Sequence, residues 1–515
     1  MSAGRGRGAL AAAGLGAGAL LAASLPPWGW WPLGPAGAAA LAADLADRAW
    51  SRRLLVGAAA GLGLYGPGLW WMTGFSAPGY VLTTLLEAGI LGVAMVAVPP
   101  RRGRFLAFPA ALVLADAVSG HWPFGGLPLA GVALGQAGGP LAPAARLGGH
   151  LLLVGMVGVA GVAVAVLGKA VAGAHRPAPG GPACRRAPGR RRIAGSVAGL
   201  AAVGAVALAG HLARPGRQVG TLRVAAVQGG GARGLRAVFT DPSVALDASV
   251  AASARVRRPV DLVVWPEDVV SVDGPLAGSA EEATVAGVAR SLGATTVAGV
   301  VEDAPGNRFR NAAVAWGPDG RILGRYDKVH RVPFGEYVPL RGVVSRLADV
   351  SAVPRDAVAG TGPGLLRTPA GPLGVVISYE VFFADRARAA VRAGGEVLLV
   401  PTNASSYTTS QVPAQELAAA RLRALETGRD VVQAAPTGFT AVVDPSGAVH
   451  RRSHLGPAAV VEATVARRRG QTVATRLGDG PLVAAAVVTL ALSRPWRRKV
   501  ERPGRRLVVE NPEDG

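Results

Sequence analysis

The sequence predicts a membrane protein with a multi-span α-helical domain and, after it, an α/β domain outside the cytoplasm. Composition is the first observation: half of the 515 residues are hydrophobic and only 17% are charged, values typical of membrane proteins. Apolar stretches of near bilayer length are the second, and they crowd into the first 212 residues. The third is a single long polar stretch, residues 213–478, in which strand and helix patterns alternate.

Eight apolar stretches predict eight membrane-spanning helices. They cover roughly residues 8–25, 28–46, 53–72, 77–99, 104–120, 149–168, 193–212 and 479–493. The first also resembles a signal peptide, but we interpret it as a retained span because six more apolar segments follow directly. The predicted parts are a membrane domain of about seven helices over 1–212, a polar domain over 213–478, a last span over 479–493 and a basic cytoplasmic tail over 494–515.

The charge pattern predicts how these spans are oriented. Basic residues gather in segments 47–53, 100–104 and 169–192 and in the tail after 494. With the N-terminus in the cytoplasm, all four segments fall on the cytoplasmic side, as the positive-inside rule requires. The loops on the other side, 73–76 and 121–148, hold only Arg146 between them. We therefore expect a multi-pass cell-membrane protein whose residues 213–478 lie on the extracytoplasmic side.

Several classes of function are disfavoured. The net charge of +22 would suit a nucleic-acid partner, but the basic runs flank apolar stretches and lack interleaved aromatic residues. The single cysteine, Cys184, excludes an intrachain disulfide, and the histidines show no metal-ligand spacing. The run Gly229–Gly234 fits G-x-G-x-x-G, yet no helix opens on it and no acidic residue follows at a strand end. We expect a turn there, and neither a cofactor nor a metal.

The polar domain reads as alternating strands and helices. Predicted strands cover Leu222–Val227, Val260–Trp265, Thr296–Val301, Ala312–Trp316, Gly374–Tyr379, Glu396–Pro401 and Val431–Ala435. Predicted helices cover Ala245–Val256, Ala280–Leu292, Ala384–Ala393 and Pro413–Thr427. Short, strongly apolar strands that alternate with helices indicate an α/β fold with several buried strands.

Three segments of this domain carry chemically useful side chains. Glu267 ends the run Val263–Glu267, behind a proline that stops a strand. Lys328 stands eight residues before a second carboxylate, Glu336. Ser378 closes a third strand-like run. Reactive side chains gather at the carboxyl ends of strands in open α/β sheets, so these segments are candidates for one site.

In this order the three segments resemble the carbon–nitrogen hydrolase (nitrilase) superfamily, whose centre is Glu, Lys and Cys. Further runs narrow the resemblance to the apolipoprotein N-acyltransferases: Pro333–Pro339, Ala418–Arg429, Thr437-Gly438, Val443–Gly447 and, in the membrane part, Trp122–Pro128. The resemblance covers the chain from about residue 8 to 493 and implies an αββα sandwich for the polar domain.

By resemblance, the protein would move an acyl chain from a phospholipid donor to the N-terminal diacylglyceryl-cysteine of a lipoprotein acceptor, through an acyl-enzyme. Glu267 would be the general base and acid. Lys328 would stabilise the oxyanion of the tetrahedral intermediate. Glu336 would orient that site, and Tyr379 and Glu380 would shape the pocket.

The family nucleophile is cysteine, and Ser378 stands in its place. A thiol is partly ionised at neutral pH, whereas a serine hydroxyl needs a strong, well-placed base. The segment Asn403–Tyr407 lacks the family's tryptophan, Pro436 replaces an asparagine, and the loop after Gln228 offers Phe239 as its one aromatic. Alternatives to acyl transfer are therefore a catalytically impaired relative, serving as a lipid- or lipoprotein-binding membrane scaffold, and an altered enzyme such as a hydrolase.

Overall fold

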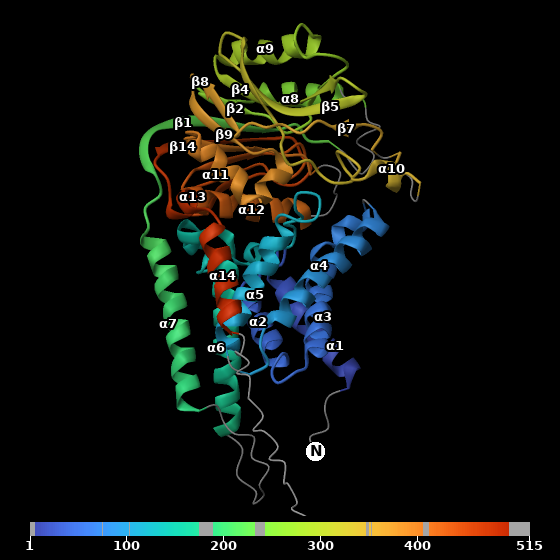
Figure 1. The fold of residues 1–515 in the computed structure, drawn as a ribbon. Helices are drawn as coiled ribbons and strands as arrows, with labels where there is room; N and C mark the ends of the chain where they lie inside the picture. The colour runs from blue at the N-terminus through green and yellow to red at the C-terminus, as the bar shows by residue number, and fades with distance from the viewer. Residues whose placement is uncertain are drawn as a thin grey trace, which may run out of the picture.

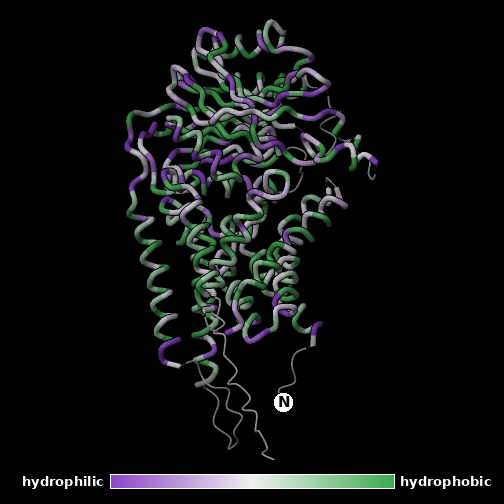
Figure 2. The backbone as a smooth tube through the Cα atoms, viewed as in Figure 1, coloured by the Kyte–Doolittle hydropathy of each residue, from purple (hydrophilic) through white to green (hydrophobic). Residues whose placement is uncertain are grey.

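A computed structural model describes residues 6–74, 76–101, 103–174, 189–231, 241, 243–346, 350–351, 353–404 and 411–493. In these ranges a helical domain precedes an α/β domain, and one helix returns from the α/β domain to pack among the others (Figure 1). The chain is apolar along the helices and mixed in the α/β domain (Figure 2). Cys184, Phe239 and the tail from 494 lie outside the described residues.

The helical domain has a helix in each of the eight predicted apolar stretches. They are α1 (Arg7–Ser24), α2 (Leu33–Asp44), α3 (Trp50–Gly68), α4 (Ala77–Ala97), α5 (Arg104–Ser119), α6 (Ala145–Ala174), α7 (Arg190–Leu212) and α14 (Gly480–Ser493). Short 3-10 turns join them: η1 (Trp70–Gly74), η2 (Val132–Gln136) and η3 (Ala142–Ala144). In the described residues, four helical segments are long and apolar enough to cross a membrane: Arg7–Ser24, Ala77–Ala97, Ala142–Ala172 and Arg190–Leu212. The count of eight spans stays a prediction.

Small residues let these helices approach closely. A Cβ on Gly18 of α1 would lie 2.0 Å from the main-chain oxygen of Ala60 on α3. On the other face of α3, a Cβ on Gly61 would lie 2.4 Å from Cα of Ala88 on α4. Close contact between helix backbones at glycine and alanine is how apolar helices gain packing energy where water does not drive them together.

The α/β domain contains two sheets that face each other. The first has the order β14-β1-β2-β4-β5-β6, with β3 paired to β4 and β7 paired to β5, and the second has the order β13-β12-β11-β10-β9-β8. The strands of the first are β1 (Arg217–Gln228), β2 (Leu262–Val264), β3 (Val270–Val272), β4 (Thr295–Ala304), β5 (Arg308–Trp316), β6 (Ile322–Asp327), β7 (Asp356–Ala357) and β14 (Ala459–Arg469). Those of the second are β8 (Leu365–Thr368), β9 (Gly371–Val375), β10 (Val397–Pro401), β11 (Val431–Ala434), β12 (Ala441–Val443) and β13 (Val449–Arg452).

Helices cover the outer face of each sheet. They are α8 (Ser243–Ser253) and α9 (Ala280–Leu292) over the first sheet, and α11 (Ala384–Arg392) and α12 (Gln411–Thr427) over the second; α10 (Arg341–Val344), η5 (Ser378–Phe382) and α13 (Val473–Leu477) are shorter. One buried cluster fills the space between the sheets, with Val264 from β2 and Leu399 from β10 among its members. A second lies under α8 and α9. The expected αββα sandwich is confirmed.

The layer of α11 and α12 rests on the helical domain, so the two domains share one hydrophobic core (Figure 1). Leu417 of α12 and Phe382 of η5 belong to the same buried cluster as Leu134 of η2 and Leu151 of α6. The face of the sandwich that carries β9 and β10 is therefore turned toward the apolar helices.

One predicted strand is wrong at its end. The run Gly374–Tyr379 was expected to be extended throughout, but β9 ends at Val375, and Ser378 begins the 3-10 turn η5. The physical reason is the backbone of Ser378, whose φ of 48° is left-handed and incompatible with a strand.

Candidate active site

Four polar side chains from the first sheet meet in a buried cluster. Nζ of Lys328, which follows β6, donates to Oε1 of Glu267 and to Oε1 of Glu336, each at 2.8 Å. Nδ2 of Asn311 on β5 donates to the same two oxygens at 2.8 and 2.9 Å. The main-chain N–H of Val332 donates to the other oxygen of Glu336 at 2.7 Å. Two carboxylates thus share one cation and one amide.

Burial dominates the electrostatics of this cluster, since Glu267 is 3% and Lys328 2% exposed. Burial raises the pKa of Glu267, and the opposing charge of Lys328 does not fully offset it, because Glu336 adds a like charge. Burial alone would lower the pKa of Lys328, but Glu267 and Glu336 raise it well above its usual range. The lysine is therefore a fixed cation, and Glu267 is a carboxyl that holds a proton more readily than an exposed one.

The position of Glu267 depends on two neighbours of its loop. The loop crosses directly over Gly299 of β4, where a Cβ would lie 2.4 Å from Cα of Glu267. Trp265, fully buried beside it, donates from Nε1 to Oγ of Ser253 on α8 at 2.9 Å. A proline stops the strand, a glycine provides the space and a tryptophan anchors the loop.

Ser378 projects from the second sheet at a strained turn. Its φ of 48° is costly for a residue with a Cβ, and the side chain is 7% exposed. Such a turn points the hydroxyl out of the line of the strand. Strain of this kind persists only where neighbouring contacts enforce it.

Glu380 supplies those contacts. Its carboxylate, fully buried, accepts from the main-chain N–H of Ile377 at 2.8 Å and from that of Val329 at 2.7 Å. It also accepts from the Tyr326 hydroxyl at 2.9 Å, and Arg386 lies 3.8 Å away. Glu380 thereby fastens the turn of the nucleophile candidate to the segment that carries Lys328.

Tyrosine hydroxyls tie the site to the loop between α5 and η2. The hydroxyl of Tyr379 donates to the main-chain oxygen of Gly126 at 3.0 Å, and that of Tyr337 donates to the main-chain oxygen of Phe124 at 3.2 Å. The ring of Phe124 meets that of Phe334 edge to face at 6.1 Å. The expected role of Tyr379 in shaping the pocket stays a prediction. The structure shows that its hydroxyl bonds to the helical domain.

Two residues from the second sheet and its helix extend the site. Oγ1 of Thr402, directly after β10, lies 3.2 Å from Oγ of Ser378 and 2.8 Å from Oε1 of Glu416 on α12. Glu416 is 4% exposed, and burial raises its pKa to about 7. The two sheets therefore contribute different groups: the Glu267–Lys328 cluster from one, and the hydroxyls with Glu416 from the other.

The structure brings Glu267, Lys328 and Glu336 into direct contact and places Ser378, Tyr379 and Glu380 together on the neighbouring turn. Sequence reasoning missed Asn311, Thr402 and Glu416. Thr402 follows a buried strand, so the rule that selected Glu267 could have selected it. Asn311 could have been identified as a polar residue within an apolar strand. Glu416 has no comparable feature in the sequence, because it stands on a helix that contains several polar residues.

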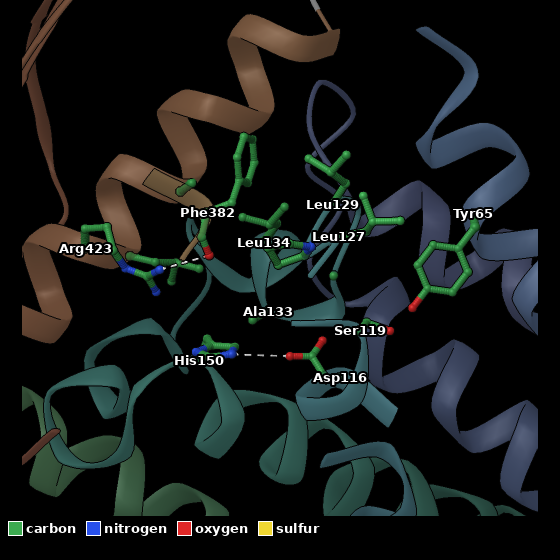
Figure 3. Close-up of a pocket in the computed structure, with 14 residues that line it drawn as sticks. Tyr65, Asp116, Ser119, Leu127, Leu129, Ala133, Leu134, His150, Phe382 and Arg423 are labelled. Carbon is green, nitrogen blue, oxygen red and sulfur yellow. Dashed lines mark hydrogen bonds and ion pairs between the residues drawn. The ribbon is translucent and has the colours of Figure 1, made fainter. Parts of the chain in front are cut away.

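A separate pocket lies between the domains, and Phe382, the last residue of η5, is part of its lining (Figure 3). Phe382 and Arg423 line it from the α/β domain, and Tyr65, Asp116 and His150 line it from the helices. Nε2 of His150 lies 3.5 Å from Oδ2 of Asp116. The pocket contains none of the predicted site residues, and apolar side chains make up most of its lining.

A cluster beside this pocket has the donor types of a metal site. Ligand atoms of His150, Glu426 and Asp479 lie within 4.8 Å of one another. Arg388, however, pairs with Glu426 at 2.7 Å and also with Asp479, and Arg423 pairs with Glu426 at 2.8 Å. Two guanidinium groups already neutralise both carboxylates, so the cluster fits an ion-pair network better than a metal ion.

Comparison with known families gives two matches that divide the chain as the fold does. Residues 223–475 match the carbon–nitrogen hydrolase family model. Residues 17–164 match that of the apolipoprotein N-acyltransferase N-terminal domain.

Individual relatives agree with these matches. An apolipoprotein N-acyltransferase of Mycolicibacterium smegmatis is 31% identical over 493 residues, 90% of this chain and 81% of the relative. One of Geobacter metallireducens is 32% identical over 270 residues, and that match spans about half of each chain, 51%. Among solved structures, Nit3 of Saccharomyces cerevisiae, a nitrilase-superfamily member, is 19% identical, with a TM-score of 0.39, over 54% of this chain and 98% of its own.

Proposed function

Because this chain belongs to the apolipoprotein N-acyltransferase family, we propose that it transfers an acyl chain from a phospholipid to the N-terminal diacylglyceryl-cysteine of lipoproteins. Ser378 is the nucleophile, and the intermediate is an oxyester on that residue. The observation that carries the proposal is the buried cluster in which Lys328 contacts both Glu267 and Glu336 at 2.8 Å. A fixed buried cation next to a carboxyl is what oxyanion stabilisation and proton transfer at one carbonyl carbon require.

The reaction divides into two half-reactions at the same carbonyl carbon. In the first, Oγ of Ser378 attacks the ester carbon of the phospholipid, and the bond to the glycerol oxygen breaks. In the second, the amino group of the acceptor attacks the serine ester, and the amide forms as the serine oxygen leaves. Glu267 is the general base and acid: it takes the proton of Ser378 and gives it to the departing alcohol, then takes a proton from the amine and returns it to the serine oxygen.

Lys328 stabilises the negative oxygen that both half-reactions form. It is a fixed cation in a site that excludes water, where a charge acts with little screening. Glu336 and Asn311 hold it in place, since each shares hydrogen bonds with the lysine–glutamate pair. Glu380 positions Ser378 through the main chain of η5.

We further propose that the chain crosses the membrane eight times and holds the α/β domain on the extracytoplasmic side, with phospholipid and lipoprotein as its membrane-borne partners. Basic loops on one side of the helices support this orientation. The test is cysteine labelling with an impermeant maleimide. Asp319→Cys, in an exposed turn, should react in intact cells, whereas the native Cys184 should react only after permeabilisation. The reverse pattern would refute the orientation.

Acyl transfer is tested with purified protein in phosphatidylethanolamine vesicles. Mass spectrometry should find one acyl group on the peptide that contains Ser378, and addition of a diacylglyceryl lipopeptide should remove it and yield the N-acylated peptide. Ser378→Ala is the control and should give neither species. Product without any adduct on Ser378 would overturn the serine-nucleophile assignment.

Ser378→Cys separates activity from the impaired alternative. An active serine enzyme should gain rate from the thiol while the unaltered protein already turns over. If the unaltered protein forms neither adduct nor product and Ser378→Cys forms both, the chain is an impaired relative whose remaining site is intact, and the proposed activity fails.

A further inference from the structure

The hydroxyl of Ser378 has a hydrogen-bond partner other than Glu267. Its Oγ lies 3.2 Å from Oγ1 of Thr402, and in the described part of the chain no hydrogen bond joins it to the Glu267 carboxylate. Oε1 of Glu267 already accepts from Lys328 and Asn311. A serine hydroxyl needs a base to become a nucleophile, and the nearest path for its proton leads away from Glu267.

Thr402 stands between Ser378 and Glu416. Its Oγ1 is 3.2 Å from Oγ of Ser378 and 2.8 Å from Oε1 of Glu416. A hydroxyl carries one proton, and an ionised carboxylate can only accept. When Glu416 is ionised, Thr402 donates its one proton to that carboxylate, and Ser378 is then the donor in its contact with Thr402. Both hydroxyl protons then point toward Glu416.

Glu416 is a buried carboxyl that accepts a hydrogen bond from Thr402 and has no cation bonded to it in the described residues. It is 4% exposed, and its Oε2 has no hydrogen-bond partner in the described residues, whereas buried polar atoms are rarely left unsatisfied. Glu426 on the same helix, by contrast, is paired with two arginines. A buried carboxyl with a purely structural role needs hydrogen-bond or ion-pair partners for both oxygens. A carboxyl that accepts a proton needs an oxygen that no donor already occupies.

The charges around Glu416 suit that task. Burial has the largest effect and raises the pKa of Glu416 to about 7. The hydrogen bond from Thr402 lowers this pKa, and the negative charge of Glu267 raises it. The positive charge of Lys328 and the polar hydroxyl of Ser378 lower it further. A base with a pKa near the working pH is available as the carboxylate and still holds the proton once it has received it.

We propose that Glu416, acting through Thr402, accepts the proton of Ser378 when the serine attacks the phospholipid ester, and returns it when the serine leaves. The proposal rests on the acyl transfer proposed above and assigns the serine proton to a second carboxyl. Glu267 then serves only the substrate side, the alcohol and the amine.

The protons balance over the full cycle. In the first half-reaction the Oγ–carbon bond forms while the serine proton moves to Thr402 and the threonine proton moves to Glu416. Glu267, protonated, gives its proton to the alcohol as the ester bond breaks. In the second half-reaction the amine forms the amide and gives its proton to Glu267, and the serine oxygen recovers a proton from Glu416 through Thr402. Both carboxyls return to their starting states.

The test measures the rate of acyl-adduct formation on residue 378 in phosphatidylethanolamine vesicles between pH 5.5 and 8.5. The unaltered protein should lose rate below about pH 7, because protonated Glu416 cannot accept a proton. Glu416→Gln should slow the step by about 10²- to 10³-fold and remove the limb near pH 7. Thr402→Val keeps the shape of the side chain but removes the hydroxyl that links Ser378 to Glu416. It should slow adduct formation and change the pH profile in the same way.

A matched control and a rescue separate this role from a structural one. Thr296→Val changes a buried threonine of β4 whose hydroxyl has no hydrogen-bond partner, and it should leave the rate and the pH profile unchanged. In a Ser378→Cys background, Glu416→Gln and Thr402→Val should lower the rate less than tenfold, because a thiol ionises with less help.

Two results would overturn the relay. One is an unchanged rate and pH limb in Glu416→Gln; the other is an equal loss from Glu416→Gln with serine and with cysteine at 378, which would make Glu416 a structural group. Absence of any adduct in the unaltered protein would instead refute the proposed acyl transfer, and that outcome is distinct from both.

Discussion

The hydroxyl of Tyr379 donates a hydrogen bond to the main-chain oxygen of Gly126, 3.0 Å away. The residue next to the proposed nucleophile is thus tied to a loop of the helical domain 253 positions earlier in the chain. Ser378 is held from two sides, since Glu380 fastens the same turn to the segment of Lys328. The helical domain is therefore part of the geometry of the site.

Tyr379→Phe should slow acyl-adduct formation about fivefold, because one hydrogen bond contributes about 1 kcal/mol and this bond holds the turn of Ser378. Rate is followed by mass spectrometry and stability by thermal unfolding in detergent. Tyr80→Phe is the matched control, since its hydroxyl donates to the main-chain oxygen of Gly66 at 2.9 Å inside the helical domain. Equal rates for the two variants would show that the tie does not position Ser378.

Lys328→Met should abolish adduct formation and destabilise the protein by about 3–5 kcal/mol, because it leaves two buried carboxylates without their cation. Glu267 and Glu336 would then repel each other. The double variant Lys328→Met/Glu267→Gln should recover part of the lost thermal stability and none of the activity. Recovery of activity would contradict the assignment of Lys328 to the oxyanion.

Glu416→Gln should stabilise the protein at pH 8 and leave stability almost unchanged at pH 4.5. The folded-state pKa of about 7 lies above the ordinary value of 4.5, so the folded state binds the proton more tightly. The free energy of unfolding therefore falls by about 3 kcal/mol in all as the pH rises from about 4.5 to 7. Thermal unfolding against pH measures the gain, and Asp247→Asn, an exposed carboxyl on α8, should show none.

Gly299→Ala should lower the rate of adduct formation at least tenfold, because its Cβ would lie 2.4 Å from Cα of Glu267 and push the loop away from Lys328. Gly287→Ala on α9 is the control, since nothing lies within 4 Å of its Cβ and alanine favours a helix by up to about 1 kcal/mol. If Gly299→Ala matched this control in activity, the close approach would not position Glu267.

Local sequence predicted the parts of the site that stand at the ends of apolar strands. Glu267 and Ser378 follow such strands, and Lys328 was identified by its distance from Glu336 along the chain. Helix α9 was predicted with its observed bounds, Ala280–Leu292, because Ser279 caps its N-terminus and Gly293 ends it. In these cases the deciding interactions join residues that are close in sequence.

Other parts depend on contacts that no local pattern reveals. Glu416 stands on a helix whose mixed charged and apolar residues suggest a solvated face, yet the helix is buried between the second sheet and the helical domain. The end of β9 was missed for the same reason. Ser378 adopts a left-handed backbone because Glu380 also binds the segment after β6, and propensity does not account for a partner about 50 residues away.

The pairing of β1 with β14 has a consequence for the order in which the protein is made. These strands join residues 217–228 to 459–469 in antiparallel register, so the first strand of the α/β domain finds its neighbour only after about 240 further residues have been synthesised. Until then one edge of β1 is open, and pairing over such a separation is slow. Biogenesis therefore depends on keeping an unfinished sheet from associating with other chains until β14 has been synthesised.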